Sequence, residues 1–397
     1  MTIAIVVLQV ASASAKTLVV SKGVNCWPQV AGPLYPTIQA AVNAMPTAGT
    51  AVNTVIVCPG IYPEQVVITK NITITGALRD GTDPESQNGN SAEARIVVPP
   101  GGLVALPFGS GFIAAQIVAQ NIADLNLTNL TIDGNGGGCP LDPAGQPVRS
   151  AGIALLNVGL PGTSYDATIS KNNIRSQVGK KSDGSRCYAD AGQGEGVIAE
   201  DSWFTLDSNS IHGIDLSPVH QIRGISRIKS NSLGLGFYGV WLSNVSLTAA
   251  NNAGSTVSLN DIQGFSAGIH LDASSNVLVT QNNISNWTGA GIWLSHGSSD
   301  NDLISNRIAD AWYGIDLGGA GDGLGGHARN TVRSNTITRS ARAAIVDVFS
   351  HGSNQISSNT ISDAPIGVFY MSTVDDVFVP NSFFNVTVLI TTGTSLP

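Results

Sequence analysis

Apolar residues recur along this chain in short clusters separated by small polar residues, with no helix-length pattern between them. From residue 172 onward, one cluster per repeat begins with Asn-x-Ile or Asn-x-Leu. This pattern occurs at residues 172–174, 209–211, 231–233, 260–262, 282–284, 306–308, 335–337 and 359–361. After Asn209 the intervals are 22, 29, 22, 24, 29 and 24 residues. The basic repeat is therefore 22 to 24 residues long, and the longer intervals contain insertions.

Each repeat contains further strand-like segments. About eight residues after the asparagine, most repeats carry a second apolar run: YGVWL (238–242), AGIHL (267–271), AGIWL (290–294), YGIDL (313–317) and IGVFY (366–370). A third apolar patch precedes the next asparagine. Three short strands in so few residues describe one coil of a parallel β-helix. A coil cannot bury its apolar side alone, so successive coils stack.

The recurrent asparagine has a structural explanation. At a tight corner, asparagine tolerates the left-handed backbone conformation. Its amide can also hydrogen-bond to the equivalent asparagine in the coils above and below. We therefore expect an internal asparagine ladder rather than a set of ligands.

The first hundred residues fit the same architecture. YPTIQAAVNAM (35–45) has helical spacing of apolar residues, and VNTVIVCPGIYPEQVVITKNITITG (52–76) follows it. With the Asn-x-Ile repeats, these segments make residues 35–375 resemble the pectin-lyase-like superfamily of right-handed parallel β-helices. The resemblance implies an all-β solenoid with a short N-terminal capping helix, which protects the open end of the stack.

The catalytic motifs of that superfamily are mostly missing. The characteristic stretches of pectin methylesterases are absent, so Glu64 and Gln65 are interpreted as part of the first coil's structure. The Arg-Ile-Lys sequence at 227–229 lacks the partner motifs of polygalacturonases and is interpreted as coincidental. HGIDLSPVH (212–220) is only faintly similar to a motif of alginate C5-epimerases. The resemblance is specific for the fold and weak for activity.

Composition and charge limit the classes of molecule that the chain is expected to bind. Only 12% of the residues are charged, and the net charge is −8. Nucleic-acid binding is therefore not expected, because it requires a basic face. No apolar run is long enough to span a bilayer.

The ends and the cysteines suggest export. Residues 3–10 followed by ASASA (11–15) resemble a secretory signal, so residues 1–15 are assigned to a signal peptide, truncated at its start. Residues 16–397 form the β-helix domain, with insertions near 134–150 and 176–196. Among three connectivities of the four cysteines, we expect Cys26–Cys58 and Cys139–Cys187. We expect a monomer that is secreted, periplasmic or at the cell surface.

One outward residue from each coil falls into a single column. Side chains alternate between the faces of a strand, so Trp293, between two core residues, points away from the core. The predicted column contains Trp241, His270, Trp293, Asp316 and Phe369; Asp347 joins it if its strand slips by one residue. With strands about 4.8 Å apart, the column spans about 25 Å. Asp272 lies on the same face as His270.

Aromatic faces beside carboxylates suit sugar rings, so the column is interpreted as a polysaccharide-binding surface. Trp241, Trp293, Asp272 and Phe369 are the candidate binding residues. In a glycoside hydrolase, Asp316 and Asp347 would be the paired acid and base. In a polysaccharide lyase, carboxylates would hold Ca²⁺ against a uronate, and His270 would remove the proton. Lys180, Lys181 and Arg186 are candidate bases if their loop folds over the groove.

Two other functions remain open. The missing motifs favour a non-catalytic extracellular adhesin or surface scaffold, in which the aromatics fill the underside of a loop and the two aspartates are solvated. A uronan C5-epimerase is the lesser alternative, because of the faint motif at 212–220. Two carboxylates in an open groove favour an enzyme, whereas a covered column favours a scaffold.

Overall fold

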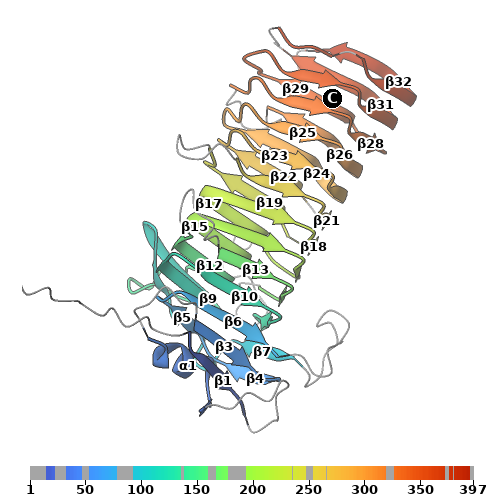
Figure 1. Ribbon diagram of the computed structural model, residues 1–397. Coiled ribbons are helices and arrows are strands. Elements are labelled where there is room, and N and C mark those ends of the chain that lie inside the picture. The colour runs from blue at the N-terminus through green and yellow to red at the C-terminus, as the bar shows by residue number, and fades with distance from the viewer. Residues whose placement is uncertain are drawn as a thin grey trace, which may run out of the picture.

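The computed structural model is a parallel β-helix, which rises coil by coil from the N-terminal end to the C-terminal end (Figure 1). The structure describes residues 15–22, 33–46, 53–77, 93–135, 138–159, 167–177, 194–234, 236–246, 254–264, 266–318, 326–371, 375–378 and 380–393. Except for the antiparallel pair of β8 (Leu106–Phe108) and β9, the named strands of this part pair in parallel. The all-β solenoid predicted from the repeats is confirmed.

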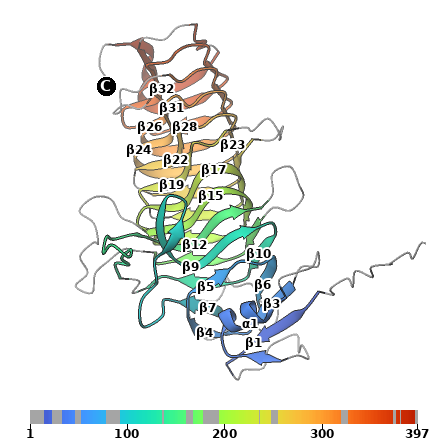
Figure 2. The same ribbon diagram turned by 90° about the vertical axis from the view of Figure 1, so that its left-hand side faces the viewer.

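The strands form three stacks along the helix, and two views a quarter-turn apart show the same ascending order (Figures 1 and 2). Stack A carries the candidate column; in chain order it contains β5 (Val66–Ile68), β9 (Gly111–Ile122), β12 (Arg149–Val158), β15 (Gly194–Asp207), β17 (Ser217–Lys229), β19 (Tyr238–Ser243), β22 (Ala267–Asp272), β24 (Asn283–Ser295), β26 (Arg307–Leu317), β29 (Ala343–Val348), β31 (Thr360–Met371) and β32 (Ser382–Thr392).

Stacks B and C complete each coil, and the long strands β15, β17, β24, β26, β31 and β32 run through a corner into one of them. Stack B contains β1 (Thr17–Val20), which also pairs with β2 (Leu34–Tyr35), then β3 (Asn53–Val57), β6 (Ile72–Gly76), β10 (Leu125–Thr128), β13 (Ala167–Ser170), β20 (Thr256–Ser258), β23 (Leu278–Thr280), β25 (Asp302–Ile304), β27 (Thr331–Arg333) and β30 (Gln355–Ser357). Stack C contains β4 (Gly60–Pro63), β7 (Ala94–Val97), β11 (Thr131–Asp133), β14 (Asn173–Arg175), β16 (Ser210–His212), β18 (Ser232–Gly234), β21 (Asp261–Gln263) and β28 (Thr336–Thr338).

The core is a set of aliphatic columns inside the coils. In stack A, an isoleucine or valine of each coil lies on its counterpart in the next, as Ile269, Ile292 and Ile315 do. The glycine of the repeated Gly-Ile-x-Leu pattern precedes this residue at a corner. A Cβ atom on Gly291 would lie 2.4 Å from Cγ2 of Ile308 across the coil. The pattern therefore needs glycine here, because a core isoleucine fills the space.

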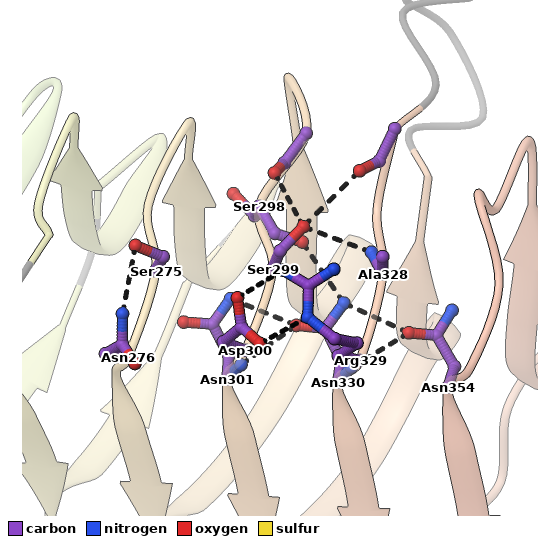
Figure 3. Close-up of polar contacts among 12 residues, drawn as sticks. Ser275, Asn276, Ser298, Ser299, Asp300, Asn301, Ala328, Arg329, Asn330 and Asn354 are labelled. Carbon is purple, nitrogen blue, oxygen red and sulfur yellow. Dashed lines mark hydrogen bonds and ion pairs between the residues drawn. The ribbon is translucent and has the colours of Figure 1, made fainter.

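The predicted asparagine ladder is confirmed. From Asn209 onward, each ladder asparagine accepts, on its side-chain oxygen, hydrogen bonds from the backbone N–H and the side-chain amide of the asparagine one coil below. These contacts, of 2.9 to 3.1 Å, connect Asn172, Asn209, Asn231, Asn260, Asn282, Asn306, Asn335, Asn359 and Asn381. A second, shorter ladder joins Asn301, Asn330 and Asn354, beside the Asp300–Arg329 ion pair (Figure 3).

The predicted capping helix is α1 (Ile38–Ala44). It lies against β1 at the N-terminal end of the stack (Figure 2). Thr37 caps it by accepting the N–H of Ala40, and the carboxylate of Glu64 accepts the N–H groups of Ile38 and Gln39, each at 2.9 Å. Glu64 therefore has a structural role at the first coil, as the sequence indicated. Free N–H groups at a helix start favour such an acceptor.

Cys58 and Cys139 each take part in a disulfide bond. Cys26 and Cys187 lie outside the described residues, so the expected pairing stays a prediction. Residues 1–14 of the expected signal peptide, and Lys180, Lys181 and Arg186, also lie outside them. Within the described part of the chain, no helix is long and apolar enough to cross a membrane.

We predict that Asn282→Ala lowers the free energy of unfolding by about 2–4 kcal/mol, because several buried partners lose their hydrogen bonds at once. Asn282 accepts two hydrogen bonds from Asn260 and donates to the carbonyls of Val257 and Thr280. Guanidinium unfolding followed by circular dichroism measures the change. The control is Asn283→Ala, an exposed neighbour with one side-chain contact to Asp261. Equal losses in the two variants would contradict the ladder's stabilising role.

Candidate functional site

The predicted outward column exists. Strand pairing in stack A places Trp241 beside His270, His270 beside Trp293, and Trp293 beside Asp316. Phe369 lies in the same column two coils above Asp316, after Val346. In the other direction, the column continues from Trp241 to His220. The aligned register brings side chains from residues more than a hundred positions apart onto one line.

The rings of the column stack on one another. The imidazole of His220 lies 4.0 Å from the indole of Trp241, and the two rings are nearly parallel, at 2°. His270 stacks on Trp293 at 4.1 Å and 6°, and on Trp241 at 5.9 Å and 15°. Ring faces therefore pack against ring faces along the helix axis. The sequence analysis expected the indole faces to be platforms for sugar rings. Because ring faces pack against one another instead, the indoles present their edges outward.

Most of the column is covered. His270 is 4% exposed, Asp316 3% and Phe369 4%, whereas Trp241 and Trp293 are partly exposed. Tyr238 lies against three of the rings, at 4.9 Å from His270, 5.0 Å from Trp241 and 6.5 Å from Trp293. Its burial, and then the charge of Asp272, raise the pKa of its hydroxyl. The column is therefore a wall of ring edges rather than an open aromatic strip.

Two exposed aromatic residues flank the column, and the sequence analysis did not select them. Phe237 immediately precedes strand β19 and is 39% exposed, and Trp312 lies within strand β26 and is 45% exposed. The guanidinium of Arg342 lies 4.8 Å from the Trp312 ring. The sequence could have identified them, since each residue immediately precedes a Tyr-Gly pair of the repeat.

Asp347 is not part of the column, because the one-residue slip that would place it there does not occur. Val346 takes the column position, and Asp347 pairs with Leu317, a core residue. Asp347 is fully buried, and burial, followed by the nearby charge of Asp376, raises the pKa of its carboxyl to about 8. A protonated carboxyl tolerates this interior position far better than a carboxylate would. Asp316 and Asp347 therefore face opposite sides of the sheet.

A polar network lies beside His270. Its Nε2 is 2.8 Å from Oγ of Ser295, and this hydroxyl donates to Oδ1 of Asp272 at 3.1 Å. Nδ1 of His296 also lies 2.5 Å from Oδ1 of Asp272. Asp272 therefore lies on the same face as His270, as predicted, and connects it through Ser295 to the exposed His296.

This network determines where the proton of His270 lies. The single proton of Ser295 is donated to Asp272, so Ser295 accepts from Nε2–H of His270, and the lone pair of the neutral ring is on Nδ1. Burial lowers the pKa of His270 to about 4, although the charge of Asp272 acts in the opposite direction. His270 is therefore a neutral imidazole at neutral pH with a bare Nδ1, which is the form a base requires.

A second polar group adjoins the other end of the stack and was missed in the sequence. Nδ1 of His220 lies 3.0 Å from Oε1 of Glu195, and Nη1 of Arg149 lies 3.3 Å from the same oxygen. Glu195 is fully buried and His220 is 2% exposed. His220 was detectable as the residue after the core valine, but Pro218 and Gln221 replace the glycine and leucine of the repeat.

The described residues give no sign of a metal centre. Among them, no three His, Cys, Asp or Glu side chains gather closely enough to hold a metal ion. The Ca²⁺-dependent lyase chemistry therefore finds no ligand set in this part of the chain.

Comparisons with known proteins agree with this architecture. The sequence profile of the family described as "Right handed beta helix region" matches residues 163–361. No curated protein matches the sequence. The structure is similar to the Dettilon tailspike protein gp208, with a TM-score of 0.53 and 12% identity over 85% of this chain, and spans 62% of the tailspike's length.

Two further solved structures are less similar. PfbA, a surface adhesin of Streptococcus pneumoniae, has a TM-score of 0.49 and 12% identity, covering 88% of this chain and 85% of its own. The A-module of the Azotobacter vinelandii mannuronan C-5 epimerase AlgE6 has a TM-score of 0.48 and 15% identity, covering 87% and 94%. At 12% identity, the likeness to the tailspike supports the fold alone.

We predict that Asp347→Asn removes a pH dependence of stability. Asp347 has a pKa of about 8 in the folded chain against 3.8 ordinarily, so its stabilising contribution is complete below pH 3.8 and is lost as the pH rises through 8. The free energies of unfolding of variant and wild type should diverge in the variant's favour by about 1.4 kcal/mol per pH unit across this window. Guanidinium unfolding from pH 4 to 8.5 measures this; the exposed Asp302→Asn is the control. Parallel curves for Asp347→Asn and wild type would contradict the buried, protonated state.

Proposed function

Because this chain belongs to the right-handed β-helix family, whose coils hold side chains at a fixed spacing, we propose that its outward column binds a polysaccharide and that His270 acts on it as a base. One observation carries the proposal. Trp241 and Trp293, two coils apart in the column, are half-buried, and Phe237 and Trp312 beside it are exposed. Aromatic surface that stays in contact with water is available for packing against the apolar faces of sugar rings.

The shape of the surface favours a polymer over a small metabolite. The rings of the column from His220 to Trp293 belong to four successive coils. Strands in such a stack lie about 4.8 Å apart, so these rings extend over about 14 Å. The exposed Phe237 and Trp312 lie beside the column, also three coils apart. Their exposed rings offer the apolar faces on which sugar rings stack, a role the sequence analysis gave to Trp241 and Trp293.

The chemistry that the site supports is proton removal. In the proposed step, a hydroxyl group of the bound polysaccharide gives its proton to Nδ1 of His270, which leaves an alkoxide on the sugar and an imidazolium on the protein. The imidazolium is then stabilised through Ser295 by the carboxylate of Asp272. General-base assistance of this kind contributes about 10²–10⁴-fold to a rate.

Hydrolysis by paired carboxylates has less support. That mechanism needs two carboxyl groups that flank the scissile bond in one open groove, about 5–10 Å apart. Asp347 points into the coil and Asp316 points out of it. We therefore assign neither the acid nor the base of a glycoside hydrolase to this pair, and His270 is the proposed catalytic residue.

A non-catalytic adhesin or scaffold is the second candidate, and the burial of most of the column favours it, since a covered column is what a scaffold predicts. At the C-terminal end of the column, Tyr313, Val346 and Phe369 are buried in an apolar cluster, together with Ala290, Ala343, Val348 and Met371. These coils resemble packed structure more than a groove. The proposal therefore places the ligand on the coils from His220 to Trp293. Location outside the cell belongs to either proposal and rests on the expected signal peptide.

We predict that His270→Gln lowers turnover of the cognate polysaccharide at least about 100-fold and leaves affinity nearly unchanged, because glutamine keeps a donor toward Ser295 but cannot accept a proton at this pH. Product release from a panel of polysaccharides, and affinity electrophoresis on the same panel, measure the two effects. His351→Gln, an exposed histidine outside the column, is the control. Retained turnover in His270→Gln would show that His270 is not the base. A wild-type chain that binds a polysaccharide without turnover would favour the adhesin.

We predict that Trp241→Phe weakens polysaccharide binding about 3- to 10-fold, since phenylalanine keeps the aromatic stack with His220 but lacks the indole N–H. The control is Trp203→Phe. Trp203 also has a buried indole nitrogen with no partner among the described residues, but it lies outside the column. Affinity electrophoresis of both variants gives the comparison. Equal retardation of wild type and Trp241→Phe would show that the column N–H groups do not contact the polymer.

A further inference from the structure

The second asparagine ladder continues to an aspartate. In this ladder the backbone N–H groups of Asn301 and Asn330 are donated to the side-chain oxygen of the asparagine one coil above (Figure 3). The backbone N–H of Asn354 is donated in the same way, at 2.7 Å, to Oδ1 of Asp376. Asp376 therefore takes the next position of the ladder, but its side chain has no N–H group with which to donate a hydrogen bond.

The carboxyl groups of Asp376 and Asp347 meet at this position. The two side chains are hydrogen-bonded to one another, and Nδ2 of Asn354 lies 3.4 Å from both carboxyl oxygens of Asp347. Asp347 is fully buried, and Oδ2 of Asp376 is buried as well. Because a carboxylate can only accept a hydrogen bond, the contact between the two groups requires a proton on one of them.

The surroundings of the pair favour keeping this proton. Burial, and then the negative charges of Asp376 and Asp316, raise the pKa of the Asp347 carboxyl to about 8. Burial raises the pKa of Asp376 as well. The other titratable side chains on the elements packed around the pair are Asp375, beside Asp376, Tyr370 on β31, and His327 and His351 beside Ser350.

Asp376 belongs to a short segment, residues 375–378, which we call the cover segment. Its backbone is held on the coil below by two hydrogen bonds. The N–H of Val377 is donated to the carbonyl of Asn354 at 2.9 Å, and the N–H of Ile356 is donated to the carbonyl of Val377 at 2.7 Å. Phe378 packs against the hydrophobic core, and its ring stacks on that of Tyr370 at 4.9 Å. The cover segment therefore closes one part of the core, and Asp376 is its polar anchor.

We propose that the cover segment is a pH-dependent latch: a proton shared between Asp347 and Asp376 holds it on the coil below, and loss of this proton releases it. Without the proton, two carboxylates would face one another in a buried position, where repulsion is strong. Opening moves Asp376 into water and lets water reach Asp347, so that both charges are solvated. This inference does not depend on the proposed polysaccharide binding.

The direction of the pH dependence follows from proton linkage. Asp347 has a pKa of about 8 with the segment closed and 3.8 ordinarily, so the closed segment binds one proton more than the open segment between these two values. The stabilising contribution of the proton is complete below pH 3.8 and is lost as the pH rises through 8. The equilibrium constant for opening therefore rises about tenfold per pH unit within this window and becomes constant above it.

Amide hydrogen exchange of the full chain, followed by mass spectrometry from about pH 5 to 8.5, tests the latch. The informative amides are those of Asn354, Ile356 and Val377, whose hydrogen bonds break on opening. After correction for the intrinsic exchange rate, we expect their protection to fall about tenfold per pH unit up to pH 8. At every pH they should exchange at least about tenfold faster than the amide of Asn282 in the first ladder, because the latch opens without unfolding of the other coils.

Asp376→Asn tests the carboxyl pair, because its amide replaces one of the two charges and can donate to Asp347. At pH 8 we expect the protection of the three amides to be at least about tenfold higher in this variant than in wild type. Asp375→Asn, at the exposed neighbouring residue, is the matched control and should exchange as wild type does. Asp347→Asn should in addition remove the pH dependence of the protection.

Each contrary outcome overturns one part of the inference. Protection that does not change with pH in wild type overturns the shared proton. Equal protection of the three amides and of Asn282 at every pH overturns the local opening, because the segment would then open only with global unfolding. Equal protection in wild type and Asp376→Asn overturns the role of Asp376, and this result stands even if Asp347→Asn fails to fold. The proposed polysaccharide binding is tested separately, by Trp241→Phe.

Discussion

Fixed register between stacked coils is the constraint on which every other feature of this protein depends. Parallel pairing sets neighbouring strands about 4.8 Å apart, and the buried asparagine ladder ties the corner of each coil to the next from Asn172 to Asn381. Because a shift of one residue would turn the core side chains outward, the ladder and the aliphatic columns fix which side chain faces outward. His220, Trp241, His270 and Trp293 form a line for this reason alone.

The same register explains why some of the site was visible in the sequence. The asparagine repeat and the Gly-Ile-x-Leu runs are periodic, because one physical demand recurs in each coil: an amide at a corner, and no side chain where a core isoleucine approaches. The alignment of Trp241, His270, Trp293 and Asp316 follows directly from them. A structural requirement that recurs in every coil produces a periodic sequence pattern, and this pattern was sufficient to predict the fold and most of the column.

The parts that could not be derived depend on side-chain direction and local exceptions. His220 escaped notice because its coil keeps the register while replacing the glycine and leucine that mark it. Asp347 was expected in the column only if its strand slipped by one residue; the pairing of its coil puts it at a leucine position instead, where burial raises the pKa of its carboxyl. Ring stacking was not predictable either, since the spacing of the repeat gives the coil in which a tryptophan lies but not the orientation of its ring.

Stacking also has a chemical consequence for His270. A ring enclosed by indoles loses contact with water, and the charged form loses more solvation free energy than the neutral form does. For His270 this desolvation outweighs the attraction of Asp272, so the imidazole stays neutral despite a carboxylate two hydrogen bonds away.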